Sequence, residues 1–81
     1  MGGTLTVTNS IISGNKSDDS GGGIYNVGTL YVLNSTLTEN TATGAGGGGI
    51  FNIGILYVTN STLSANVSTG NGGGIMNISN M

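Results

Sequence analysis

The sequence contains no cysteine, proline, histidine or tryptophan, and its charged residues are one basic and three acidic side chains. Without cysteine, no disulfide can compensate for the small core that a chain of 81 residues can build. Without histidine or cysteine, and with three acids, a zinc site or a calcium cage has few candidate ligands. We therefore expect no metal and no cofactor, and stability that comes from packing and backbone pairing.

The scarcity of charge also limits the partners that the chain can bind. The charged residues are Lys16, Asp18, Asp19 and Glu39, and the formal net charge is −2. A nucleic-acid binder needs a patch of lysine and arginine, which this composition excludes. No apolar run approaches the roughly 18–20 residues that span a bilayer. We expect neither nucleic-acid binding nor membrane insertion.

Three repeats of 25–26 residues fill the sequence, which we interpret as one domain over residues 1–81. Residues 3–27 read GTLTVTNSIISGNKSDDSGGGIYNV. Residues 28–53 read GTLYVLNSTLTENTATGAGGGGIFNI, and residues 54–78 read GILYVTNSTLSANVSTGNGGGIMNI. The middle repeat has one extra residue between Asn40 and Ile50, which we expect in the glycine-rich loop.

Apolar and polar residues alternate within each repeat, which is the pattern of half-buried strands. Three short strands per repeat are predicted. Their inward side chains should be Leu5, Val7, Ile12 and Ile24 and the equivalent residues of the other repeats, Leu30, Val32, Leu37, Ile50, Leu56, Val58, Leu63 and Ile75. An antiparallel sandwich is the main rival, but it gives no reason for the same residue type to recur every 25 residues. A parallel β-solenoid does, because equivalent residues stack about 4.8 Å apart.

Asparagine recurs at three positions of each repeat, at the ends of the predicted strands. Asparagine tolerates the left-handed backbone conformation, and stacked amides can hydrogen-bond along a solenoid axis as a ladder. We predict three such ladders, formed by Asn9, Asn34 and Asn60, by Asn15, Asn40 and Asn66, and by Asn26, Asn52 and Asn77.

The repeated motif GGGIYN followed by GTLYVLNSTLTEN resembles the repeats of bacterial right-handed parallel β-helix proteins. It is most similar to those of polymorphic-outer-membrane-protein-type and autotransporter-like surface proteins, and the resemblance extends over residues 3–78. It implies a right-handed, single-stranded parallel β-helix of about three coils. It also implies an exported bacterial protein at the cell surface or outside the cell, with no particular chemistry.

Several motifs are of the kinds found in active or binding sites, but each lacks part of the required pattern. The glycine runs lack the Lys-Ser/Thr and helix of a phosphate-binding loop, and their recurrence indicates close packing between coils. Asp18 and Asp19 lie in a predicted loop without the calcium-binding nonapeptide pattern. Glu39 has no carboxylate partner at the spacing that glycoside hydrolysis needs, and Lys16 is the one basic residue. We expect no enzymatic activity.

Two outward surfaces are candidates for binding. Thr36, Thr38, Thr62 and Ser64 resemble the flat threonine arrays of ice-binding solenoids, although Ile11 and Ser13 interrupt the columns. Aromatic and methionine side chains form the second candidate, a lateral contact stripe of Tyr25, Phe51, Met76, Tyr31 and Tyr57. Strand alternation points these residues outward, whereas a corner that reverses the alternation would place some in the core.

No cap is recognisable at either end of the repeats, so both end coils should expose strand edges over an apolar interior. One hypothesis is a structural subunit that stacks end to end with copies of itself into an extracellular filament. The alternative is a segment of a longer surface adhesin that binds a glycan or another surface ligand. A glycan-binding monomer would favour the second, and ligand-independent association the first.

Overall fold

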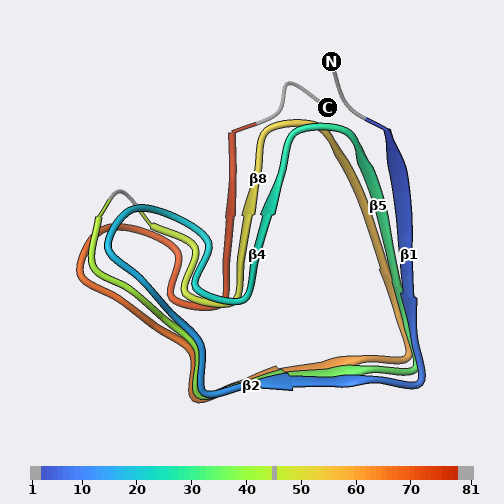
Figure 1. Cartoon of the computed structure of the whole chain (residues 1–81), viewed down its shortest axis with the longest axis horizontal. Helices are drawn as coiled ribbons and strands as arrows, with labels where there is room; N and C mark the ends of the chain where they lie inside the picture. Colours follow the sequence, from blue (N-terminus) through green and yellow to red (C-terminus); the bar gives the residue numbers. More distant parts are fainter. Residues whose placement is uncertain (1–2, 45, 79–81) are drawn as a thin grey trace.

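The computed structural model describes residues 3–44 and 46–78, and these form an all-β structure (Figure 1). No helix among them is long and apolar enough to cross a membrane. The strands are β1 (Thr4–Thr8), β2 (Ile11–Ser13), β3 (Lys16–Ser17), β4 (Ile24–Asn26), β5 (Thr29–Leu33), β6 (Thr36–Thr38), β7 (Thr41–Ala42), β8 (Ile50–Asn52), β9 (Ile55–Thr59), β10 (Thr62–Ser64), β11 (Val67–Ser68) and β12 (Ile75–Asn77).

Each strand pairs in parallel with the equivalent strand of the next repeat. The four resulting sheets have the strand orders β1-β5-β9, β2-β6-β10, β3-β7-β11 and β4-β8-β12. Leu5 pairs with Leu30, and Leu30 with Leu56, so equivalent side chains are stacked. In Figure 1 the chain runs clockwise and recedes from the viewer, from β1 in front to the third coil behind. The predicted right-handed parallel β-solenoid of three coils is therefore confirmed.

Each coil contains four strands rather than the three that the sequence predicted. The additional strands are β3, β7 and β11, with two residues each. Their inward residues, Ser17, Ala42 and Ser68, are small and mostly polar. A two-residue strand without a large apolar side chain shows no alternation, which is why the pattern did not reveal this sheet.

The extra residue of the second coil lies in the glycine-rich loop, as predicted. Before this loop, Ala42 pairs with Ser68, 26 positions further along the chain. After it, Gly46 pairs with Asn71 and Ile50 with Ile75, both 25 positions apart. The insertion thus lies between Ala42 and Gly46, and the strands on both sides of it keep their register.

The apolar core is centred on the second coil. Leu30, Val32, Leu37 and Ile50 are each 0% exposed and form one cluster. The equivalent residues of the outer coils, among them Val7, Ile12 and Leu56, are partly buried and pack against this cluster. The sequence thus predicted the inward positions, and the degree of burial depends on whether a coil has neighbours on both sides.

Two of the corners in each coil depend on residues with a left-handed backbone. The corner after the first strand has Asn9, Asn34 or Asn60, with φ of 51°, 51° and 48°. The corner after the second strand has Gly14, Glu39 or Ala65, with φ of 67°, 57° and 53°. Asparagine tolerates this region, whereas Glu and Ala adopt it at a cost of roughly 1–2 kcal/mol.

We expect the Ala65→Gly variant to be more stable than the parent chain by about 0.5–1 kcal/mol. Glycine removes the steric penalty at φ 53°, although it adds some freedom to the unfolded chain. The measurement is the free energy of unfolding from urea denaturation. Ala42→Gly is the matched control, because Ala42 is 0% exposed in β7 and its φ is not positive, so this change should destabilise. Equal effects at both positions would contradict the assignment of strain to the corner.

Candidate functional site: side-chain ladders and the two coil edges

The column of Asn15, Asn40 and Asn66 forms a hydrogen-bonded ladder along the solenoid axis. The Nδ2 of Asn15 donates to Oδ1 of Asn40 at 3.1 Å, and the Nδ2 of Asn40 donates to Oδ1 of Asn66 at 3.0 Å. The backbone N–H groups of Asn15 and Asn40 donate to the same two oxygens. Asn40 is 0% exposed, so the ladder replaces the water that this amide would otherwise bind.

Asn26, Asn52 and Asn77 form a second ladder at the end of the fourth strand. The Nδ2 of Asn26 donates to Oδ1 of Asn52 at 2.6 Å, and the Nδ2 of Asn52 donates to Oδ1 of Asn77 at 2.8 Å. Each Nδ2 also donates to a backbone carbonyl two residues further on, that of Gly28 or Gly54, which closes the corner. Both predicted ladders are confirmed.

The third asparagine column has a different role from the one predicted. Asn9, Asn34 and Asn60 are exposed, and no side-chain hydrogen bond joins them among the residues that the structure describes. Their contribution is the left-handed corner, where the N–H of Asn9 donates to the carbonyl of Leu33 and the N–H of Asn34 to that of Thr59. The prediction of a third asparagine ladder is therefore wrong, because the left-handed turn directs these side chains outward.

A serine ladder, which the sequence analysis missed, lies beside that corner. The N–H of Ser10 donates to Oγ of Ser35 at 3.1 Å, and the N–H of Ser35 donates to Oγ of Ser61 at 3.0 Å. Ser35 is buried, and each hydroxyl donates in turn to the carbonyl two residues before it. The signal was present in the sequence, since serine follows the corner asparagine in all three repeats.

All three ladders have the same polarity. In each, the earlier coil donates and the later coil accepts, from Asn15 through Asn40 to Asn66 and from Ser10 through Ser35 to Ser61. Within the described residues, the backbone N–H groups of Ser61 and Asn66 reach no acceptor at the end of the third coil, whereas the Nδ2 of Asn66 donates to the carbonyl of Leu37. The first-coil edge correspondingly presents Oδ1 of Asn15 and Oγ of Ser10 as acceptors.

Apolar side chains are exposed at the same two edges. Leu5 of the first coil is 52% exposed, and Val58 and Ile75 of the third coil are each 37% exposed, whereas Leu30 between them is 0% exposed. These residues point into the solenoid, and among residues 3–44 and 46–78 a neighbouring coil covers them on one side only. Each end thus combines an unpaired strand edge with an apolar interior, the combination that favours pairing with another chain.

The glycine runs allow the backbones of successive coils to approach closely. A Cβ on Gly23 would lie 2.7 Å from the carbonyl oxygen of Gly49, and one on Gly49 would lie 2.6 Å from that of Gly74. A Cβ on Gly74 would meet nothing within 4 Å among the described residues. The steric need for glycine in this column therefore depends on the presence of a following coil.

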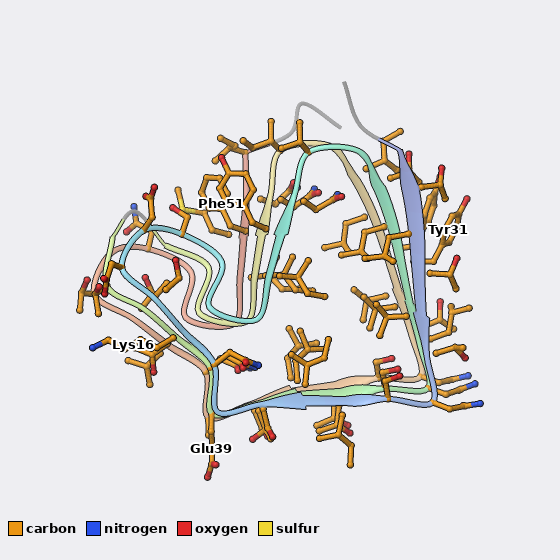
Figure 2. The ribbon with its side chains drawn as sticks, in the orientation of Figure 1. Lys16, Tyr31, Glu39 and Phe51 are labelled. Carbon is orange, nitrogen blue, oxygen red and sulfur yellow. The ribbon has the colours of Figure 1, made fainter. Side chains whose placement is uncertain are left out.

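The aromatic residues form two separate columns instead of a single lateral stripe. Tyr31 and Tyr57 stack with ring centroids 4.9 Å apart on the outer face of β5 and β9. Tyr25 and Phe51 stack with centroids 5.1 Å apart, on the opposite side of the core and facing the glycine-rich loop (Figure 2).

Phe51 is only 6% exposed, and Met76, the third member of its column, packs close to Gly46. The exposed stripe that alternation predicted is therefore corrected at Phe51, which lies between Tyr25, whose ring stacks on its own, and its register partner Met76. Tyr25 and Tyr57, at 52% and 49%, remain exposed.

The charged residues lie on the outside and do not converge. Lys16 and Glu39 point away from the core (Figure 2), and Asp18 and Asp19 are exposed in the loop of the first coil. Among the described residues, no group of three or more potential metal-ligating side chains is present, and no pocket is found. The features available for interaction in this part of the chain are its outer faces and its two coil edges.

The stacked parallel sheets and the polar ladders define a repeat protein of the parallel β-solenoid class. The model of one family, the Chlamydia polymorphic membrane protein (Chlamydia_PMP) repeat, matches residues 9–27. This segment covers the first left-handed corner, the sheet-forming Ile12, the glycine run and Asn26. Neither a curated protein nor a solved structure matches the chain. The repeat match and the solenoid together fit a bacterial surface repeat protein.

Proposed function

We propose that this chain is a non-enzymatic structural module that associates end to end with further copies of itself into an extracellular filament. Its working surfaces are the first-coil edge and the third-coil edge. The observation that carries the proposal is the contrast within one column of inward leucines. Leu30, covered on both sides, is 0% exposed, and Leu5, covered on one side, is 52% exposed.

A further coil at each edge would give the first and third coils neighbours on both sides, as the second coil already has. It would cover the exposed inward side chains, which favours association by roughly 25 cal/mol per Å² of apolar area buried. It would also pair the strand edges, which carry no charged inward residue to oppose pairing. Because one edge differs from the other, such contacts do not close, and they propagate as a fibre.

The test is static light scattering and sedimentation velocity of the purified chain across a dilution series. We expect the weight-average mass to rise well above the 7.9 kDa of one chain as concentration increases, without any added ligand. A chain that remains a monodisperse monomer at high concentration would refute the proposal.

A surface adhesin segment is the second candidate, and the stacked Tyr31 and Tyr57 on an uncharged outer face favour it. The similarity of residues 9–27 to a polymorphic membrane protein repeat also supports a location at the bacterial surface. In that role the chain would bind a glycan or another surface ligand as a monomer. Glycan binding by a chain that does not self-associate, abolished by Tyr57→Ser, would select this function.

A further inference from the structure

We infer that copies of this chain join head to tail in one register, in which the third coil of one copy pairs with the first coil of the next. In that register Asn66 donates to Asn15 of the next copy and Ser61 donates to its Ser10. The inference rests on the proposed end-to-end association and specifies its partner, its polarity and its alignment. Three observations carry it.

The first observation is that the two outer coils match each other in length. Inside the chain, the offset between paired residues changes at the glycine-rich loop, because the second coil has one residue more than either neighbour. Both outer repeats have 25 residues, so their equivalent positions differ by 51 all the way round, from Leu56 and Leu5 to Ile75 and Ile24. A junction between outer coils therefore needs no adjustment in the loop, unlike the two contacts within the chain.

The second observation is the shared polarity of the ladders. The third-coil edge presents the backbone N–H groups of Asn66 and Ser61, and the first-coil edge presents Oδ1 of Asn15 and Oγ of Ser10. Donors thus meet acceptors only when unlike ends join. Two first-coil edges facing each other would place oxygen acceptors opposite one another, which loses these hydrogen bonds and leaves polar groups unpaired on burial.

The third observation is the glycine column. Gly23 and Gly49 are each covered by the next coil, whose carbonyl oxygen would lie 2.7 and 2.6 Å from an added Cβ. Gly74 occupies the same position in the third coil with open space around it. In the head-to-tail register the carbonyl of Gly23 from the next copy takes that space. A side chain at position 74 should therefore leave the monomer intact and obstruct the junction.

Two variants, each blocking one end, test the inference. Gly74→Ala obstructs the third-coil edge, and Leu5→Lys places an ammonium group where the junction would bury it without a carboxylate partner. Each variant alone should be a monomer at concentrations at which the parent chain associates. Ile11→Lys is the matched control, since Ile11 is 75% exposed on the outer face of β2 and a neighbouring coil does not cover it. This control should associate like the parent.

The decisive sample is an equimolar mixture of the two blocked variants. Each variant retains the edge that is blocked in the other, so the mixture should form 1:1 dimers of twice the 7.9 kDa chain mass and nothing larger. Native mass spectrometry with one variant isotopically labelled measures the mass and composition of these dimers. Far-UV circular dichroism and melting curves verify that both variants are folded.

Other outcomes separate the two proposals. Homodimers formed by each variant alone would show that like ends join, which overturns the polarity and register but keeps end-to-end association. Fibres from either blocked variant, or a mixture of folded monomers, would also overturn this inference. A parent chain that never associates would overturn the proposed function itself and this inference with it.

Discussion

The Asn40→Asp variant is expected to be largely unfolded at neutral pH. Asn40 is 0% exposed, and its Nδ2 donates to the carbonyl of Ile12 at 3.1 Å and to Oδ1 of Asn66 at 3.0 Å. A carboxylate replaces this donor with an acceptor that faces two oxygens. The one basic side chain, Lys16, points away from the core, so the buried charge has no partner. Such uncompensated burial costs roughly 3–5 kcal/mol, and small domains have few kcal/mol to lose.

The pH dependence of stability of the Asn40→Asp variant distinguishes the effect of the buried charge from the effect of the lost hydrogen-bond donor. Burial raises the pKa of the introduced carboxyl group above its ordinary value of about 3.9. Because the pKa is raised in the folded state, the free energy of unfolding of the variant is closest to that of the parent at acid pH. There the neutral carboxyl group still donates one hydrogen bond. It loses stability as pH rises. Chemical denaturation at pH 3 and pH 7 measures this difference.

Asn34→Asp is the control for this substitution, because it lies on an exposed left-handed corner that aspartate also tolerates. It should change the free energy of unfolding by about 0.5 kcal/mol or less. Equal losses for the two substitutions would contradict the ladder.

The Leu30→Ala variant should lose about 2–5 kcal/mol of unfolding free energy, which is a large part of the stability of an 81-residue chain. Leu30 is 0% exposed at the centre of the core and is flanked by Leu5 and Leu56 in the coils on either side. Removing its side chain leaves a cavity between three stacked coils. Urea denaturation under dilute, monomeric conditions measures the loss.

Leu5→Ala provides the matched control for this cavity. It removes the same atoms from the same column of the same sheet, but Leu5 is 52% exposed and its removal opens no enclosed cavity. The expected loss is about 1 kcal/mol, from the lost transfer free energy alone. If the two variants lost equal stability, the core would not be centred on the second coil.

The columns of identical residues were sufficient to predict most of this fold. Stacked leucines, isoleucines and asparagines fix the register, because a slip by one residue would direct every inward side chain outward. The repeat length located the insertion between Asn40 and Ile50, and the alternation identified the inward face of every long strand. These features recur in every repeat, so comparison of the three repeats within one sequence was enough to identify them.

The features that the sequence did not predict depend on three-dimensional context. Phe51 follows an inward isoleucine, and alternation alone could not show that its side chain is buried, with its ring stacked on that of Tyr25. Asn34 and Asn40 are the same residue type at two corners. Asn34 has a left-handed φ of 51°, which directs its side chain outward, whereas the φ of Asn40 is not positive and its side chain joins the ladder. Serine recurs after each corner asparagine, but this recurrence alone did not show that Oγ of Ser35 accepts a hydrogen bond from the backbone N–H of Ser10 in the previous coil.

End-to-end association through the coil edges is tested most directly by negative-stain electron microscopy of the unmodified chain, with X-ray diffraction from an aligned sample. End-to-end association should give uniform thin fibres with a strong axial reflection near 4.8 Å, the strand spacing, and a weaker repeat of roughly 14 Å from the three-coil subunit. Monodisperse particles with the 26 × 25 × 17 Å extents of one chain, with no fibres at any concentration, would contradict it.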